Sequence, residues 1–126
     1  MLNPPASEEQ ISALSSALGC QVAELESFYR RANGMADGAT DAHLVAVWSI
    51  EKILDEHKLN WGSDANGPYC DWAFGDVLIY SHLLAVRLRG GLAPTYVVDG
   101  YSARESSSLE TFFGAYLEDP CEFGTY

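Results

Sequence analysis

The chain has 126 residues and a formal net charge of -11, from 18 acidic side chains against 7 Lys and Arg. That length predicts a single domain over residues 1–126, with one core that buries roughly two thirds of the unfolded surface. So few basic side chains argue against nucleic-acid binding, because phosphate neutralisation needs clustered Lys and Arg. No apolar run approaches the roughly 20 residues that cross a bilayer, so we do not expect this chain to be a membrane protein.

Residues 1–10 show neither the basic region nor the apolar region of a secretory signal, which predicts a cytoplasmic address. The acidity of the chain has two open interpretations. It can steer a basic partner toward the protein by long-range attraction, or it can simply keep the protein soluble.

A capping box predicts the first helix. Ser7 is followed three residues later by Gln10, so their side chains can bond reciprocally to free backbone N–H groups at a helix start. We expect this helix to run from about Ser7 to Leu18. Gly19 ends it, because glycine accepts the left-handed conformation found at helix C-termini.

The spacing of apolar residues predicts a second helix from about Val22 to Ala32. They fall at i, i+3, i+4 and i+7 on one face: Leu25, Phe28, Tyr29 and Ala32. Asn33 and Gly34 tolerate positive φ, so we expect them to end the helix in a left-handed cap. The apolar face requires a sheet or another helix to cover it.

A loop, a strand and a short helix are expected next. Residues 35–41 have the composition of a loop, and residues 43–50 are rich in Val, Leu and Trp, which favours a strand. Ser49 can cap a helix that runs through Lys58. Acidic residues near the start of that helix suit its dipole.

Residues 60–71 are predicted to form an exposed loop, because Gly, Pro, Asn and Asp are frequent there. This part of the chain also carries three large aromatic residues: Trp61, Tyr69 and Trp72. We expect Trp72 to close over the core. Trp61 and Tyr69, interleaved with Asp64 and Asp71, are candidate partner-binding residues, because aromatic side chains supply much of the energy at protein interfaces.

Three further strands are expected. Residues 77–80 are continuously apolar, as in a strand buried on both faces, and residues 84–88 alternate like a half-exposed strand. Residues 81–82 suit a tight hairpin between them, and the glycine pair at 90–91 makes the next turn before a strand at 95–99. Such short connections predict an antiparallel meander.

A second capping box, Ser107 with Glu110, predicts a final helix that Asp119 and Pro120 end. Its apolar residues again share one face: Leu109, Phe112, Phe113, Tyr116 and Leu117. Helices at both ends of the chain, with strands between them, predict an α+β domain. Its centre would be an antiparallel sheet of about four or more strands with helices packed against it.

Four segments, in this order, resemble the SUKH superfamily of bacterial toxin-immunity proteins and fungal cell-wall-synthesis regulators. They are the helix ending at LG (18–19) with FYRRANG (28–34) after it, VWSIEKI (47–53), FGDVLIYS (74–81) and SLETFFGAYLEDP (108–120). The resemblance implies the same α+β class and a domain that acts by binding a protein. Residues 61–72 have no obvious counterpart in the family, so individual specificity is expected there.

The chain has no nucleophile elbow, no phosphate-binding loop and no dinucleotide-binding glycine motif. The cysteines and histidines lack the spacing of metal sites or dithiols, and we expect free thiols and, for His82, a solvated turn. They are Cys20, Cys70, Cys121, His43, His57 and His82. Cys70 with His82 could form a nucleophile and base if the fold brought them together. A carboxylate pair such as Asp71 with Asp76 arises by chance in so acidic a chain.

These observations predict a non-enzymatic protein-binding domain without catalytic residues, metal or cofactor. The resemblance sharpens this to an immunity protein that binds and neutralises a cognate polymorphic or contact-dependent toxin by occluding its active site or substrate groove. An intracellular regulatory or scaffold module of the same fold is the alternative. A small hydrolase that uses Cys70 and His82 is the third possibility.

Overall fold

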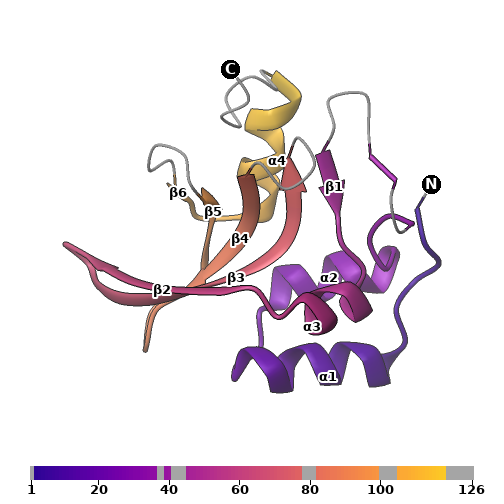
Figure 1. Cartoon of the computed structure of the whole chain (residues 1–126), viewed down its shortest axis with the longest axis horizontal. Helices are drawn as coiled ribbons and strands as arrows, with labels where there is room; N and C mark the ends of the chain where they lie inside the picture. The colour runs from indigo at the N-terminus through magenta and orange to yellow at the C-terminus, as the bar shows by residue number, and fades with distance from the viewer. Residues whose placement is uncertain (1, 37–38, 41–44, 78–81, 100–104, 119–126) are drawn as a thin grey trace.

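The computed structural model describes residues 2–36, 39–40, 45–77, 82–99 and 105–118 (Figure 1). Within these residues, four helices pack with a six-stranded antiparallel sheet, which makes the chain an α+β domain. In chain order the elements are α1 (Glu8–Leu18), α2 (Ala23–Arg31), β1 (Val45–Val47), α3 (Ile50–Glu56), β2 (Leu59–Asp64), β3 (Gly67–Val77), β4 (His82–Leu88), β5 (Thr95–Asp99), β6 (Glu105–Ser106) and α4 (Leu109–Glu118). No described helix is long and apolar enough to cross a membrane.

The predicted capping box of α1 is present. The Ser7 hydroxyl accepts from the Gln10 N–H at 3.1 Å, and the Gln10 side-chain oxygen accepts from the Ser7 N–H at 2.7 Å. Gly19 then ends the helix with φ +78°. Both ends of the predicted helix are confirmed, because each depends on residues within one turn of it.

Helix α2 ends differently from the prediction. Ala32 is extended, with φ −157°, and the left-handed residue is Gly34, with φ +67°. A Cβ at Gly34 would also clash with the backbone carbonyl oxygen of Trp48, so the position needs glycine for space as well as for φ. Asn33 contributes its side chain instead, because its Oδ1 accepts from the Ile50 N–H at 2.8 Å and ties the end of α2 to the start of α3.

The prediction of a loop at residues 60–71 is wrong, because these residues form a β-hairpin. Strand β2 pairs antiparallel with the first half of β3, from Leu59 opposite Trp72 to Asp64 opposite Gly67. At the turn, Asp64 Oδ1 accepts from the Asn66 N–H at 2.9 Å and Gly67 has φ +105°. The Asp, Asn and Gly that indicated a loop are the residues that close this turn.

Strand β3 organises the rest of the sheet. Its second half pairs with β1, and a bulge between Ala73 and Gly75 lies where its partner changes from β2 to β1. On its other side follow β4, β5 and β6, in the order β1-β3-β4-β5-β6. The predicted antiparallel meander is confirmed, and β5 has the predicted bounds.

Four smaller predictions need correction. Within the described part of the predicted 43–50, strand β1 covers Val45–Val47, since Ser49 already caps α3 by accepting from the Lys52 N–H at 3.1 Å. Helix α3 ends at Glu56, before the predicted Lys58. His82 is paired in the sheet as the first residue of β4, so it does not lie in a hairpin turn.

The last correction concerns the start of α4. Ser108, rather than Ser107, caps this helix by accepting from the Thr111 N–H at 3.0 Å, so the predicted capping box with Glu110 is wrong. The predictions for residues 41–44, 78–81 and 119–121 lie outside the residues described.

The core lies between the helices and one face of the sheet. Directly opposite residues of antiparallel strands point to the same face, which places Trp72, Val86 and Tyr96 in one buried row. Trp72, predicted to close over the core, is 5% exposed. From α4, the Phe112 ring lies 6.2 Å from the Tyr96 ring, and the Leu109 N–H donates to the carboxylate of Glu24 on α2 at 3.2 Å.

Candidate functional site

The four residues predicted to bind a partner lie on one hairpin but on two different faces of it. Trp61 is opposite Cys70 in the sheet, so both point to the face that the helices cover. Tyr69 and Asp71, which flank Cys70, point to the other face, as does Asp64. Because side chains alternate along a strand, neighbours in the sequence are divided between two surfaces of different chemistry.

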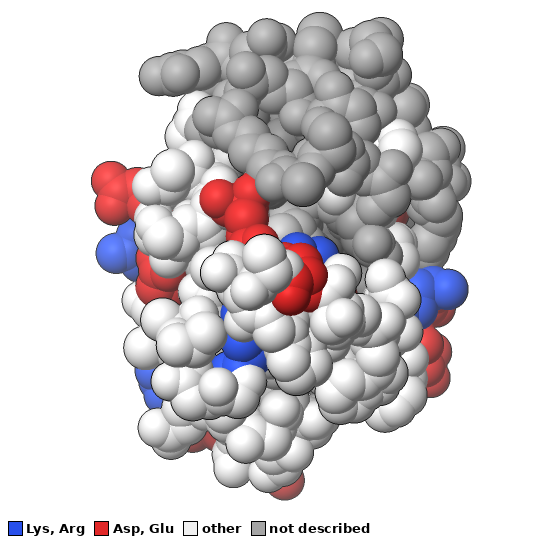
Figure 2. Space-filling view, turned by 90° about the vertical axis from the view of Figure 1, so that its left-hand side faces the viewer, with Lys and Arg blue, Asp and Glu red and all other residues white. Residues whose placement is uncertain are grey.

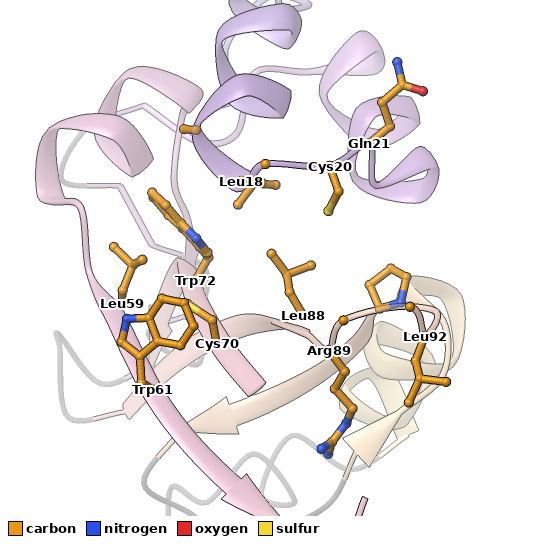
Figure 3. Close-up of a pocket in the computed structure, with 15 residues that line it drawn as sticks. Leu18, Cys20, Gln21, Leu59, Trp61, Cys70, Trp72, Leu88, Arg89 and Leu92 are labelled. Carbon is orange, nitrogen blue, oxygen red and sulfur yellow. The ribbon is translucent and has the colours of Figure 1, made fainter. Parts of the chain in front are cut away.

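On the helix side, the hairpin borders an open groove of about 560 Å³, here called the Trp61 groove (Figure 3). The end of α1 and the turn after it form one wall, and β2, β3, the end of β4 and the turn that follows form the rest. Most of the large side chains that line it are apolar: Leu18, Leu59, Trp61, Trp72, Leu88 and Leu92. Such a mostly apolar concave surface is typical of binding sites.

Two large apolar side chains of this groove are exposed. Trp61 is 75% exposed and Leu92 60% exposed, whereas Trp72, which also lines the groove, is part of the core. In Figure 3 the Trp61 indole lies beside Leu59 and Cys70, with Leu18 across the groove on the α1 side. Exposed apolar surface next to a groove marks an interaction site more often than scattered single residues do.

The groove is nearly uncharged, although the protein is strongly acidic. Of the described residues that line it, Arg89 alone is charged. Its guanidinium points away from the groove (Figure 3) and donates to both Asp64 oxygens at 2.8 Å. Figure 2 views this end of the molecule and shows acidic and basic side chains together near its centre, with a mostly uncharged described surface below them.

The other face of the hairpin holds a polar cluster, here called the arginine network: Arg87, Arg89, Asp64, Asp71 and Glu105. Arg87 donates to both oxygens of Asp71 at 2.8 and 2.9 Å, and Asp71 is 2% exposed. The Arg87 guanidinium lies 3.7 Å from the centre of the Tyr69 ring. Across the hairpin, a Cβ at Gly62 would lie 2.5 Å from the Tyr69 hydroxyl, so the ring is held between Gly62 and Arg87.

Glu105 of β6 connects the two arginines. It accepts from Arg89 at 3.2 Å, from Arg87 at 3.3 Å and from the Thr95 hydroxyl at 2.6 Å. Burial acts to raise the pKa of Glu105, but hydrogen bonds from Thr95 and Arg89 outweigh it, and the pKa lies below its ordinary value of 4.5. The hydrogen bond from Arg89 likewise holds the pKa of Asp64 below its ordinary 3.8.

The arginine network engages three of the predicted binding residues within the fold. Asp71 is buried against Arg87, Asp64 is bonded to Arg89, and Tyr69 is stacked on a guanidinium. Their role in contacting a partner stays a prediction. What the network does in the structure is to fasten the hairpin to β4 and β6, which fixes the position of Trp61 on its opposite face.

Two cysteines line the Trp61 groove. Cys20 is exposed and Cys70 is buried, and both are free thiols. Burial raises the pKa of Cys70, and the negative charge of Asp71 raises it further. Cys70 is therefore protonated at neutral pH and a weak nucleophile. Cys121 lies outside the part of the chain that the structure describes.

The structure does not bring Cys70 and His82 together. Cys70 lies opposite the last residue of β4, and His82 is the first residue of that strand, so they are roughly 20 Å apart at about 3.3 Å per residue. Asp71 and Asp76 are also separate, since Asp76 accepts from the Trp48 indole N–H at 2.6 Å. Among the described residues, no group of three or more His, Cys, Asp or Glu side chains could hold a metal ion.

The groove itself was not predicted from the sequence. Leu59 and Trp61 alternate with polar residues before Asn66, and Cys70 and Trp72 do the same after it. That alternation around an Asn-Gly pair is the signal of a hairpin with one apolar face. The contribution of Leu92 has no such signal, because it depends on how the turn after β4 folds beside the hairpin.

No family model matches the chain, and neither a search of curated proteins nor a search of solved structures returned a match.

Proposed function

We propose that the chain is a cytoplasmic protein-binding domain that binds and neutralises a cognate toxin, a function that its resemblance to the SUKH superfamily implies. The observation that carries this proposal is Trp61, a tryptophan 75% exposed at the edge of an apolar groove. Leaving so large an apolar side chain in water has no benefit for the fold. In a complex, the same side chain becomes the kind of anchor that dominates interface energies.

The mechanism would be occlusion of the toxin's active site or substrate groove. No bond is made or broken, and inhibition depends on how long the complex lasts. Trp61 and Leu92 would be buried against the toxin and contribute mainly to a slow dissociation rate, since interface contacts act mostly on that rate.

The net charge of -11 supports a basic partner. Many enzymes that attack nucleic acids are basic, because their substrate is a polyanion. An acidic inhibitor would be attracted to such a toxin over a distance of about one Debye length, so association should slow as salt is added.

The arginine network supports the proposal through rigidity. A hairpin that projects from a sheet loses conformational entropy when it binds unless it is already ordered. Here the face opposite Trp61 is fastened by two bidentate arginine pairs. Trp61 is thus presented on a strand that needs little ordering on association.

The decisive experiment uses the product of the gene that neighbours this one. Its toxin domain would be purified with and without this protein, and both binding and toxin activity would be measured at equimolar ratio. We expect a stable complex and loss of toxin activity. Full activity within a stable complex would contradict neutralisation and favour the regulatory or scaffold alternative.

Two variants make the experiment specific. Trp61→Ala should weaken the complex by at least about 30-fold, the loss expected for an aromatic hot spot worth about 2 kcal/mol. Leu2→Ala is the matched control, because Leu2 is 67% exposed and lies near the N-terminus, at the far end of the molecule from the hairpin (Figure 1). Equal loss in both variants would remove Trp61 as the anchor.

A further inference from the structure

We infer that the Trp61 groove receives a bulky apolar side chain carried on an extended, basic segment of the partner protein, which adds as a strand to the edge of β2 that faces away from β3. This inference rests on the proposed function only in taking a protein as the ligand. It specifies the chemistry of the segment that is bound.

The lining of the groove selects an uncharged side chain. Its surface comes mainly from leucines, tryptophans and small residues, and the guanidinium of Arg89 is directed away and already paired. A charged group placed there would lose water without gaining a counter-charge, which is costly. A volume of about 560 Å³ is enough for one or two large apolar side chains.

The edge of β2 indicates how the segment is held. Within the described residues β2 pairs with β3 alone, so its other edge carries backbone groups that can accept a further strand. Alternate side chains of an added strand would lie on the same face as Leu59 and Trp61, beside the groove. Backbone hydrogen bonds would then supply affinity, and the groove would select the side chain.

The charge of the protein determines what flanks that side chain. At a net charge of -11, two copies of this chain repel each other, which argues against a second copy as the occupant. A partner segment with Lys or Arg on either side of its apolar residue gains long-range attraction, while the apolar residue itself enters the neutral groove. The occupant is therefore a short basic segment with a central Trp, Phe, Leu or Met.

The test uses short linear peptides of random sequence, displayed on phage and selected on the purified full chain. Selected peptides should contain one bulky apolar residue flanked by Lys or Arg. Their affinity should fall by at least about 30-fold on Trp61→Ala, and by less on Leu92→Ala, while Leu2→Ala leaves it unchanged. Acidic peptides, peptides without an apolar anchor, or peptides that bind Trp61→Ala equally well would overturn the inference.

A second measurement locates the peptide. Cys20 is exposed and lines the groove, so its alkylation by iodoacetamide, followed by mass spectrometry of each cysteine, should slow when a selected peptide is bound. Unchanged alkylation would place the peptide elsewhere and overturn the inference. So would a concentration-dependent dimer in analytical ultracentrifugation that Trp61→Ala abolishes, since a second copy would then occupy the groove.

These measurements need no toxin, so their outcome is separate from that of the proposed function. If selected peptides require Trp61 but the neighbouring toxin stays active, the groove is a peptide-binding site and the proposal of toxin neutralisation is contradicted. If the toxin is neutralised but no selected peptide requires Trp61, neutralisation is supported and the inference about the groove is contradicted.

Discussion

On the hairpin formed by β2 and β3, the Tyr69 ring lies 3.7 Å from the Arg87 guanidinium on one face, while Trp61 on the other face is 75% exposed. The two aromatic residues lie on paired strands, and Tyr69 is the neighbour of Cys70, the residue that pairs with Trp61. Tyr69 is enclosed by Gly62 and Arg87 and serves the fold. Trp61 has no comparable enclosure and is open to a partner.

This difference separates residues that stabilise the hairpin from residues that are available for binding. Exposed fraction and internal bonding together distinguish the two, whereas residue type does not. Substitutions on the network face should therefore change the free energy of unfolding, and substitutions on the groove face should change affinity. Four predictions test this division, ordered by the size of their expected effect on unfolding.

The largest effect is expected from Arg87→Met. It leaves the Asp71 carboxylate, 2% exposed, without its counter-charge, and breaking a buried pair in this way costs about 3 kcal/mol or more. Urea unfolding followed by circular dichroism measures the loss. Replacing both partners, as Asp71→Leu with Arg87→Met, should recover most of it. If the double variant is as unstable as the single one, the uncompensated charge is not the cause.

The next effect is expected from Gly62→Ala. The new methyl group would lie 2.5 Å from the Tyr69 hydroxyl, so the ring must leave its place beside Arg87, at a cost of about 1–3 kcal/mol. Ser63→Ala is the control, because Ser63 is the exposed neighbour on the same strand. Equal unfolding midpoints for the two variants would show that the ring is not held as described.

A smaller effect is expected from acid. The pKa values of Asp64 and Glu105 are lowered in the folded protein, so the stability they contribute is present above their unfolded values and is lost as the pH falls below about 4.5 and then 3.8. Melting temperature measured against pH should decline more steeply for the wild type than for the double variant Asp64→Asn, Glu105→Gln. Parallel curves for the two proteins would contradict this assignment.

The smallest effect on unfolding is expected from Trp61→Ala. An exposed side chain removed from a strand changes the free energy of unfolding by about 0.5 kcal/mol or less. Circular dichroism is the suitable probe, since the substitution removes a fluorophore. A loss comparable to that of Gly62→Ala would mean that Trp61 supports the fold, and the division between the two faces would fail.

Much of the fold could be predicted because its signals are local. Ser7 with Gln10, Ser49 and Gly19 mark helix ends through hydrogen bonds or conformations that involve only one turn of chain. The strand at Thr95–Asp99 and the antiparallel order followed from short connections. Within the run of three serines at 106–108, the prediction of Ser107 as the cap was wrong, because the local pattern does not distinguish it from Ser108.

The hairpin could not be predicted in the same way, because its stability comes from other parts of the chain. In the sequence alone, Gly62 indicates a loop and Asp71 indicates a solvated acid. In the structure, Tyr69 lies against Gly62 and Arg87 pairs with Asp71. Trp61 was predicted as a candidate partner-binding residue, and the structure leaves it 75% exposed. Its groove depends on Leu18 and Leu92, which are brought near it only by the folded chain.

The carboxylate of Glu24 accepts from the N–H of Leu109, a residue 85 positions later in the chain. Phe112 in the same helix covers the aromatic rings of Phe74 and Tyr96. During synthesis, α4 is the last of the described helices to emerge from the ribosome. Until it has emerged, the rings of Phe74 and Tyr96 are not covered by it. Such distant closure is slow relative to local contacts, so completion of the fold follows synthesis of the helix, and chaperones would meet these rings on any stalled nascent chain.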